Sequence, residues 1–432
     1  MERILDRKIA PEGKPFRYIA LPNYAERQLN NGIKVYLLQH GNVEACEIQA
    51  VFKAGASFEP KVGLSDFVPR NMSEGTENYT AQTFAEALDK VGAWMNYDAG
   101  NESVSINLAC LSHLVSKALP LMQESMLRPT FPKESVEKLK QRTLQRLSVS
   151  QKKTSYMAAI QFPKLLFGDG HPYSNSLDTK ELQAIQHEDL AHYHENYLYA
   201  GNYFFVVVGK FDEKMMMHEL EENFGHLPVR PALQIESSSK LTEIVSQPAG
   251  FYQHEMESGL QSSLRIGHLG MNRLHPDSEK MELVNTFLGG YFGSRLMKNI
   301  REEKGYTYGI NSHWVMYRYG GYLQIGCDAG NEYVQPVIEE VKKEIELLQN
   351  EGVSQAELDL VRNYRMGKSI GERETLFQLG NLLRFSLVNG ISFAELDRKY
   401  QTFAEMSTND VQELANKHLK INDLRILVCG KK

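Results

Sequence analysis

The chain has 432 residues, of which 42% are hydrophobic and 24% are charged, and its formal net charge is −6. This length exceeds what one hydrophobic core organises, so we expect at least two domains, and the composition excludes a largely disordered chain. The Lys and Arg residues are spread along the sequence, which gives no electrostatic basis for binding nucleic acid or an anionic membrane surface.

The cysteines and the apolar segments indicate a reducing, aqueous environment. Each cysteine lies in an apolar run typical of a strand, and none forms a CxxC pair: Cys46, Cys110, Cys327 and Cys429. We expect buried, reduced thiols; a cysteine metal site is the less favoured alternative. No signal-peptide-like segment opens the chain, and no stretch approaches the roughly 18 apolar residues that cross a bilayer. We therefore expect a soluble, cytoplasmic protein without a membrane span.

The first half of the chain predicts strands followed by helices. An apolar strand (47–55) precedes a helix over 63–73, and two strands fall within 93–111. Apolar residues at helical spacing then predict a helix in 113–126, and a charged amphipathic run after Ser135 predicts another in 131–147. A short helix and an apolar strand (189–210) end this half.

The second half repeats this order. A strand (262–270), a helix (277–290), two strands (309–330) and helices within 334–349 and, after Ser354, within 353–370 precede a last helix and strand (410–431). The segments DLAHYHENYLYAGNYFFVVVGK and DVQELANKHLKINDLRILVCGK both run from Asp to Gly-Lys. Asp189 and Asp410 are 221 residues apart, and so are Gly209 and Gly430.

This duplication predicts an α+β fold of two homologous domains, each a mostly antiparallel sheet with helices packed on one face. We expect one domain over 1–230 and the other over 246–432. The segment 231–245 is predicted to be a linker, because the sequence around it is rich in Pro and Ser and shows no helical period.

Two stretches carry a family resemblance: GLSDFVPRNMSEGT (63–76) and LGGYFGSRLMKNIREEKGYTYGI (288–310). With the duplicated halves, they make the chain resemble the pitrilysin, or insulinase, family of inverted-motif zinc peptidases, which includes insulin-degrading enzyme and the mitochondrial processing peptidase. The resemblance covers nearly the whole chain. It implies that the two domains form one half of a clam-shell.

The positions that bind zinc in this family hold other residues here. The family motif is H-x-x-E-H on a helix, and its histidines and glutamate correspond to Asp66, Arg70 and Pro69. A guanidinium has no lone pair for a metal, and a proline is no general base and is expected to interrupt the helix. A further family glutamate falls on Gln145 or Arg146. The resemblance thus implies no metal in this chain, with zinc expected in a partner subunit.

A second histidine-rich stretch, HEDLAHYHE, resembles a zinc motif less closely. His187 and His192 are five residues apart, so their side chains point about 140° apart around a helix and cannot share one ion. We interpret His187, Glu188, His192, His194 and Glu195 as a solvated helix face. His268 and His313 are isolated and are interpreted as packed or surface residues.

The resemblance also implies a complementing pair. In the family, an Arg and a Tyr at the spacing of Arg301 and Tyr308 stabilise the oxyanion and hold the substrate backbone, and Tyr306 lies beside them. Both side chains are suitable donors to a developing negative charge. The alternative is that Arg301 pairs with Glu302 or Glu303 and Tyr308 packs in a sheet. Asn96 corresponds to a residue of the family's peptide-binding edge strand, although Tyr97, Asp98 and Ala99 depart from its pattern.

Three functions remain open at this point. The favoured hypothesis is a zinc-less peptidase subunit that pairs with a zinc-bearing homologue, or with a second copy of itself, and contributes peptide binding and oxyanion stabilisation. The alternative is a structural or peptide-binding homologue with no role in catalysis. An autonomous metallopeptidase with relocated ligands is the least favoured.

Overall fold

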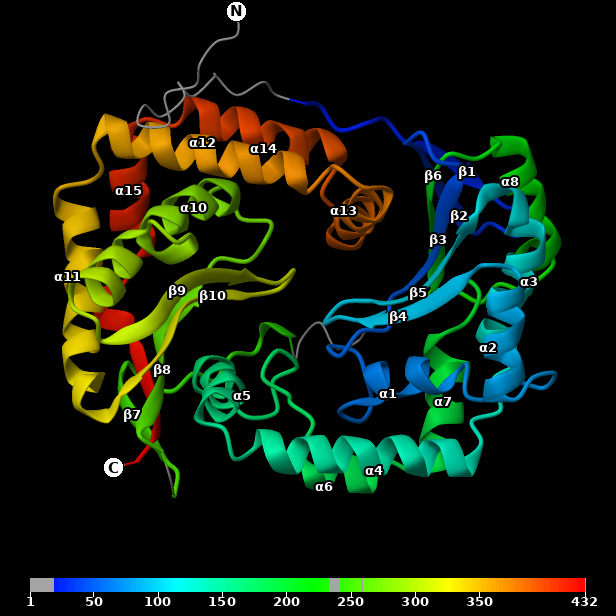
Figure 1. Ribbon diagram of the computed structural model, residues 1–432, viewed down its shortest axis with the longest axis horizontal. Helices are drawn as coiled ribbons and strands as arrows, with labels where there is room; N and C mark the ends of the chain where they lie inside the picture. The colour runs from blue at the N-terminus through cyan, green and yellow to red at the C-terminus, as the bar shows by residue number, and fades with distance from the viewer. Residues whose placement is uncertain (1–18, 233–240, 258, 432) are drawn as a thin grey trace, which may run out of the picture.

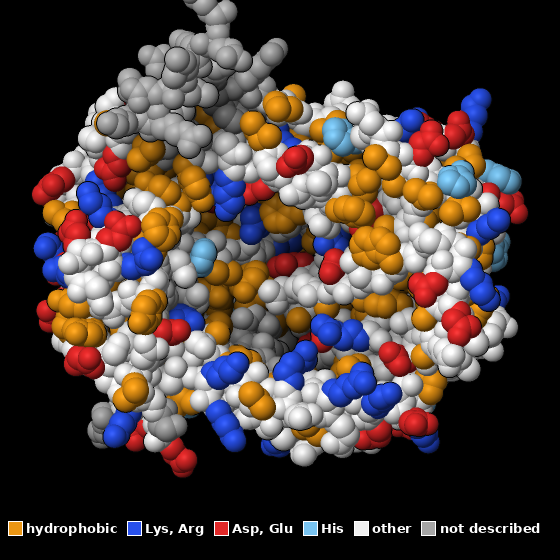
Figure 2. Space-filling model, in the orientation of Figure 1, with side chains coloured by type: hydrophobic (Ala, Val, Ile, Leu, Met, Phe, Trp, Pro, Cys, Tyr) orange, Lys and Arg blue, Asp and Glu red, His pale blue; other side chains and the backbone are white. Residues whose placement is uncertain are grey.

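The computed structural model describes residues 19–232, 241–257 and 259–431, which form two β-sheets surrounded by helices (Figure 1). The sheets lie on opposite sides of the molecule, and Figure 2 shows the face between them hollowed at its centre. Within the described residues, no helix is long and apolar enough to cross a membrane.

The first sheet has six strands in the order β1-β2-β6-β3-β5-β4. Only β2 and β6 pair in parallel, and β4 is an edge strand. The bounds are β1 Ala25–Gln28, β2 Lys34–Gln39, β3 Ala45–Phe52, β4 Trp94–Ala99, β5 Val104–Leu111 and β6 Tyr203–Gly209.

The second sheet has five strands in the order β7-β11-β8-β10-β9, with one parallel pair, β7 and β11. Its strands are β7 Gly250–Glu255, β8 Gln261–Gly270, β9 Thr307–Met316, β10 Gly321–Gly330 and β11 Arg425–Gly430. The orders β6-β3-β5-β4 and β11-β8-β10-β9 correspond strand for strand. This correspondence confirms the predicted duplication and the α+β class.

The helices of the first half are α1 Leu64–Asn71, α2 Ala81–Lys90, α3 Val115–Leu127, α4 Lys133–Ser150, α5 Thr154–Phe167, α6 Thr179–Ala184, α7 His187–Tyr197 and α8 Glu213–Leu220. Those of the second half are α10 Ser278–Asn285, α11 Val334–Asn350, α12 Gln355–Gly371, α13 Leu376–Asn389, α14 Phe393–Glu405 and α15 Thr408–His418, with a π-helical turn at Met297–Glu303. Helices α7 and α15 start and end 221 residues apart, the offset expected from the sequence.

The predicted helix starts are partly correct. Ser354 caps α12, where its side chain accepts a hydrogen bond from the Glu357 backbone N–H. Ser135, by contrast, lies inside α4, which begins at Lys133 directly after Pro132. Proline fixes φ near the helical value and suits a helix start, so α4 begins earlier than the serine suggests. The predicted linker falls largely on 233–240, outside the described residues, and the boundaries at 230 and 246 stay predictions.

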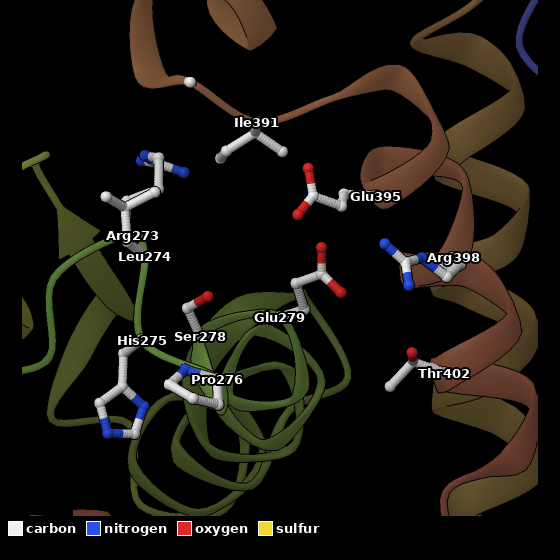
Figure 3. Close-up of a pocket in the computed structure, with 11 residues that line it drawn as sticks. Arg273, Leu274, His275, Pro276, Ser278, Glu279, Ile391, Glu395, Arg398 and Thr402 are labelled. Atoms are coloured by element: carbon white, nitrogen blue, oxygen red, sulfur yellow. The ribbon is translucent and has the colours of Figure 1, made fainter.

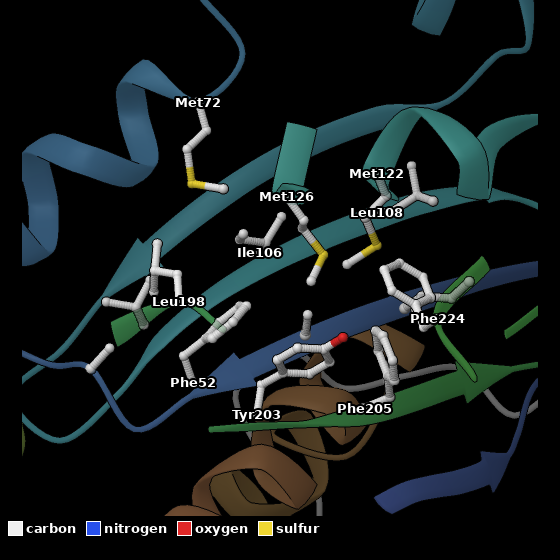
Figure 4. Close-up of a cluster of buried hydrophobic side chains, with 14 of the residues drawn as sticks. Phe52, Met72, Ile106, Leu108, Met122, Met126, Leu198, Tyr203, Phe205 and Phe224 are labelled. Carbon is white, nitrogen blue, oxygen red and sulfur yellow. The ribbon is translucent and has the colours of Figure 1, made fainter. Parts of the chain in front are cut away.

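Alternation along the central strands creates two different faces on the first sheet. On β3, Cys46, Ile48, Ala50 and Phe52 contribute to the main core, which also contains side chains from β5, β6, α1 and α3 (Figure 4). The intervening residues Glu47, Gln49 and Val51 face the opposite side. Because successive side chains of a strand point to opposite faces, every second side chain lies in the core of its own domain.

Each half also lends one helix to the sheet of the other half. Helix α13 packs on β3 and β6, where Leu379 and Leu383 join Leu38, Val51, Val206 and Val208 in one apolar cluster. Helix α5 packs on β8 and β11, where Phe162 and Leu166 join Tyr322 and Leu427. Both are the third helix after the central strands of their half, so the exchange follows the internal symmetry (Figure 1).

Candidate functional site

Helix α1 carries the residues that the resemblance assigns to the zinc motif. Asp66 and Arg70 lie one turn apart and form an ion pair, with Nη2 of Arg70 2.8 Å from Oδ1 of Asp66. Both side chains are about half exposed, at 46% and 48%. The carboxylate, the one remaining group of this frame that could ligate a metal, is therefore already neutralised by the residue at the second histidine position.

Pro69 does not interrupt the helix, which corrects the expectation from the sequence. Helix α1 runs unbroken from Leu64 to Asn71 with Pro69 buried inside it. Its first turn is secured by Glu59, whose two carboxylate oxygens accept the backbone N–H groups of Gly63 and Ser65, both at 2.7 Å. In an eight-residue helix the proline removes a single backbone hydrogen bond, and the burial of Leu64, Phe67 and Val68 holds the two turns in place.

The third ligand position offers no replacement. Gln145 and Arg146 both lie on α4 with exposed side chains. Neither an amide nor a guanidinium replaces a carboxylate as a zinc ligand. The frame that would form the metal centre therefore consists of an ion pair, a proline and exposed polar side chains.

Among the residues that the structure describes, one group could hold a metal ion: His275, Asp277 and His418, whose ligand atoms lie within 4.8 Å of one another. No sequence pattern indicates this group, because His275 and His418 are distant in the sequence. The group lies between the start of α10 and the end of α15, and all three side chains are half-buried.

The hydrogen bonds of this group favour an ion-pair network over a metal centre. Oδ2 of Asp277 accepts from Nζ of Lys417 at 2.6 Å and from Nε2 of His418 at 2.7 Å. These partners, acting against burial, lower the pKa of Asp277. Nδ1 of His275 accepts the backbone N–H of Asp277 at 3.0 Å, so this lone pair is engaged as well. A cation here would have to displace the ammonium group of Lys417.

The histidines of α7 are only partly a solvated face. Glu188, His192 and Glu195 are exposed, as expected. His187 and His194 are half-buried, and their Nε2 atoms lie 2.6 Å and 2.7 Å from the carbonyl oxygens of Phe131 and Met126. Burial lowers the pKa of His194. These two side chains tie α7 to neighbouring backbone, which explains them without a ligand role. His268 is buried and His313 is exposed, as predicted.

Arg301 and Tyr308 lie together at the start of the edge strand β9. Nε of Arg301 donates to the carbonyl oxygen of Tyr308 at 3.0 Å, and the guanidinium lies 4.6 Å from the ring centroid of Phe292. The phenol of Tyr308 is 91% exposed, and Phe292 is 63% exposed. The backbone contact and the contact with Phe292 fix the guanidinium, and the side chain of Tyr308 faces solvent.

The alternative interpretation of this pair holds only in part. Nη1 of Arg301 lies 3.8 Å from Glu302, a long and exposed ion pair that contributes little. Tyr308 does not pack in the sheet, since almost all of its surface faces solvent. Tyr306 is half-buried and stacks on Tyr333, with ring centroids 4.9 Å apart, so it supports the site rather than facing outward with Tyr308.

Asn96 lies on the edge strand β4, as the resemblance implies, and its amide oxygen already accepts a hydrogen bond. Nδ2 of Asn107 donates to Oδ1 of Asn96 at 2.7 Å and to Oδ2 of Asp98 at 3.0 Å. Nη1 of Arg384, on α13, donates to the same Asp98 oxygen at 3.0 Å. Sequence reasoning missed Arg384, because only the exchange of α13 between the halves brings it to this strand.

The sheet surface beneath α13 also holds an unusual carboxyl. Oε2 of Glu47 accepts from Nε2 of Gln49 at 2.7 Å, and burial raises the pKa of Glu47 to about 7. Arg384 acts in the opposite direction, through its charge. The alternation of β3 predicts which face Glu47 occupies, but its burial depends on α13.

A pocket of about 320 Å³ opens between α10 and the loop and helix formed by 390–402. Figure 3 shows the carboxylates of Glu279 and Glu395 facing each other across it, with Arg398 beside them and Arg273 on the opposite wall. Burial raises the pKa of Glu279. Two carboxylates and two guanidinium groups leave the pocket without a dominant charge, and neither the zinc frame nor the Arg301–Tyr308 pair lines it.

The fold and the site together define a class: a two-domain homologue of a zinc peptidase in which the zinc ligands have been replaced. Comparison with known families agrees. Residues 34–167 match the family described as Insulinase (Peptidase family M16), and residues 184–364 match the Peptidase M16 inactive domain. The chain belongs to peptidase family M16, which confirms the resemblance to the insulinase family.

The relatives extend over most of the chain. A Helicobacter pylori protein named Non-peptidase homolog YmxG is 25% identical over 395 residues, which cover 89% of this chain and 89% of the relative. A Bacillus subtilis protein named Uncharacterized zinc protease YmxG is 23% identical over 76% of this chain and 79% of its own length. The crystal structure of a peptidase M16 inactive domain from Pseudomonas fluorescens has a TM-score of 0.86 at 25% identity, covering 95% of this chain and 98% of that one.

Proposed function

We propose that this chain is the zinc-less subunit of a two-subunit peptidase. It pairs with a zinc-bearing homologue and contributes peptide binding and oxyanion stabilisation to peptide-bond hydrolysis. One observation carries the proposal: the guanidinium of Arg301 is held by the backbone carbonyl of Tyr308, and the side chain of the same tyrosine is 91% exposed. The guanidinium is thus positioned within this chain, and the exposed phenol can donate to a group of another chain.

The side chains of Arg301 and Tyr308 are suited to stabilise a transition state that forms at the metal of another subunit. When a peptide carbonyl is attacked, charge develops on its oxygen, and preorganised donors of this kind are worth about 3 kcal/mol each. The zinc frame of the same chain is filled by the Asp66–Arg70 ion pair. The chain thus keeps the donors and lacks the metal ligands of the motif, which supports hydrolysis only in combination with a metal-bearing subunit.

The proposal is tested by mixing the purified chain with a homologue from the same genome that contains H-x-x-E-H. The chain alone is expected to cleave no peptide, and cleavage is expected to appear on mixing. Arg301→Ala and Tyr308→Phe should each lower kcat about 100-fold or more in the mixture. Lys298→Ala and Tyr364→Phe, at an exposed lysine and a partly exposed tyrosine of the same half, are the matched controls and should leave kcat unchanged.

A second candidate is a structural homologue with no part in catalysis. The relatives include the bovine Cytochrome b-c1 complex subunit 1, which is 21% identical over 285 residues, 63% of this chain and 56% of that protein. The internal hydrogen bond and the aromatic contact of Arg301 are compatible with a structural role. Activity on mixing that is insensitive to both substitutions, or a stable complex without any activity, would favour this second function over donation by the pair.

A further inference from the structure

We propose that Cys46 and Cys110 form a modification site, a cross-strand dithiol that hydrogen peroxide and related small peroxides oxidise to a disulfide between β3 and β5. The two residues are direct partners in the antiparallel ladder of these strands. Their side chains belong to the same core cluster, so both sulfur atoms lie on one face of the sheet.

The register sets their separation. The backbone N–H of Ser112 donates to the carbonyl oxygen of Glu44 at 3.0 Å, two rungs beyond the cysteines. Rungs of an antiparallel ladder alternate between hydrogen-bonded and non-hydrogen-bonded pairs, so Cys46 and Cys110 also form a hydrogen-bonded pair, with Cα atoms about 5.5 Å apart. A disulfide requires Cα atoms about 4.4–6.8 Å apart, which this rung satisfies. It also requires Cβ atoms about 3.5–4.5 Å apart, closer than a hydrogen-bonded rung holds them, so the two strands must approach slightly when the bond forms.

The pair differs chemically from the other two cysteines. A hydrogen bond from the Cys110 thiol lowers the pKa of Cys46, and the same interaction raises that of Cys110. Burial raises the pKa of both Cys327 and Cys429 to about 12. The thiolate is the nucleophile in thiol oxidation, so Cys46 is the reactive sulfur and Cys110 the resolving one.

The position on the strand gives a small oxidant access. Cys46 and Cys110 are only 1% and 6% exposed. They lie near the end of the ladder: Ala45 and Leu111 are its last paired residues, one further backbone hydrogen bond joins Ser112 to Glu44, and Leu111 is 43% exposed. Ladder ends open locally at low cost, and one opened rung brings a molecule the size of a peroxide to the Cys46 sulfur.

The reaction balances with peroxide as the oxidant. The Cys46 thiolate attacks one peroxide oxygen, the O–O bond breaks, and hydroxide leaves and takes up a proton to become water, which gives a sulfenic acid. The Cys110 sulfur then attacks the Cys46 sulfur, the S–O bond breaks, and a second water leaves with the Cys110 proton. Two thiols and one peroxide thus become one disulfide and two waters.

The second sheet supplies an internal control. Cys327 on β10 packs in the core of its own domain, whereas Cys429 on β11 packs against α5 on the opposite face, and β8 separates the two strands. These thiols are as buried as the first pair but cannot meet. Oxidation that requires two neighbouring thiols should therefore leave Cys327 and Cys429 as free thiols.

The test is a count of thiols in the full-length native protein after treatment with hydrogen peroxide, with alkylation under denaturing conditions and mass spectrometry. Four alkylated cysteines should fall to two, with Cys46 and Cys110 in one linked peptide, and dithiothreitol should restore four. Cys46→Ser should keep all three of its thiols. Cys110→Ser should form no linked peptide and should lose only the Cys46 thiol, as a sulfenic acid that dithiothreitol reduces. Cys327→Ser should fall from three thiols to one, with the same link between Cys46 and Cys110. Four remaining thiols in the treated wild type, or a link through Cys327 or Cys429, would overturn the proposal.

Discussion

At the scale of single residues, Asp66 and Arg70, which the resemblance assigns to the zinc motif, form part of an ordinary helix surface. Asp66 and Arg70 keep the one-turn spacing that two zinc ligands need, and the same spacing brings a carboxylate and a guanidinium into contact at 2.8 Å. The residue between them, Phe67, is 2% exposed and points into the core. The side chain that stabilises α1 by burial and the two residues assigned to the zinc motif thus lie on different faces of the helix.

Substitutions at these neighbouring positions should therefore lower the free energy of unfolding by very different amounts. Asp66→Ala removes an exposed ion pair within one helix and should lower the free energy of unfolding by about 0.3–0.5 kcal/mol. Phe67→Ala empties a buried site and should cost about 3–5 kcal/mol. Urea unfolding of both variants measures the difference. A cost above about 1.5 kcal/mol for Asp66→Ala would show that the ion pair has a role beyond the helix surface.

Glu47 predicts a pH dependence of stability. Burial raises its pKa from near 4.5 to about 7, so the folded state binds the proton more tightly than the unfolded state. The stability that this proton provides is fully present below about pH 4.5 and is lost as the pH rises through about 7. At pH 8, Glu47→Gln should therefore be more stable than the wild type by up to about 3 kcal/mol, and the two should converge near pH 4.5.

Urea unfolding at pH 5 and pH 8 measures this effect, with Glu44→Gln as the control. Glu44 is exposed just before the same strand and pairs with Lys210 at the surface, so its substitution should change stability little at either pH. An equal effect of Glu47→Gln at both pH values would mean that Glu47 is not protonated in the folded state.

Residue identities in the motifs were readable from the sequence, whereas their contacts were not. The spacing of Arg301 and Tyr308 predicts their proximity, but the contact that joins them runs through a backbone carbonyl, which no side-chain pattern encodes. Likewise, the alternation of β3 places Glu47 and Cys46 on opposite faces. Only the tertiary structure shows that one face is covered by α13 and that Cys46 lies opposite Cys110.

At the scale of elements, helix α13 fits closely against the first sheet. A Cβ atom added to Gly380 would lie 2.8 Å from Cγ1 of Val208 and 3.1 Å from both Nε2 of Gln49 and Oε2 of Glu47. The glycine lets the helix backbone approach β3 and β6 closely. It is kept despite its low helix propensity because the sheet leaves no room for a side chain.

We therefore predict that Gly380→Ala destabilises the protein by about 1–3 kcal/mol, since overpacking outweighs the gain in helix propensity. Gly367, on α12, has open space around the same added atom and is the matched control. Gly367→Ala should stabilise the protein by about 0.5–1 kcal/mol. Thermal unfolding of the two variants should shift in opposite directions. Stabilisation by both would show that α13 does not pack closely on the sheet.

The elements also show where sequence patterns stop being informative. The duplication is predictable because α7 and α15 share their length and an aspartate at the third helical position, Asp189 or Asp410, whose side chain accepts the backbone N–H of the N-cap residue. The partner of an apolar helix is not predictable in this way. The pattern of α5 or α13 indicates a buried face, but the sheet that covers it belongs to the other half and is chosen by the chain's path between the halves.

At the scale of the whole molecule, the exchanged helices join the halves into one unit. Without α13, the first sheet would expose Leu38, Val51, Val206 and Val208. Without the second sheet, α5 would have no sheet to pack on. The N-terminal segment adds a further connection, because the Leu21 backbone N–H donates to Asp397 on α14. Two domains related by duplication are thus interdependent in folding.

This interdependence predicts the behaviour of separated halves. A fragment of residues 1–240 should bind an apolar dye, aggregate on size exclusion and lack a cooperative urea transition, because each half exposes an apolar face of several residues. Refolding it together with residues 241–432 should restore a complex with a single unfolding transition, since both exchanged helices can then pack on their sheets.

The substitutions Leu379→Asp and Leu383→Asp in the second fragment should prevent the complex from forming, because they place unpaired charges against Val206 and Val208. A first fragment that unfolds cooperatively by itself, with no gain on mixing, would show instead that each domain is stable alone and that α13 is a peripheral cover.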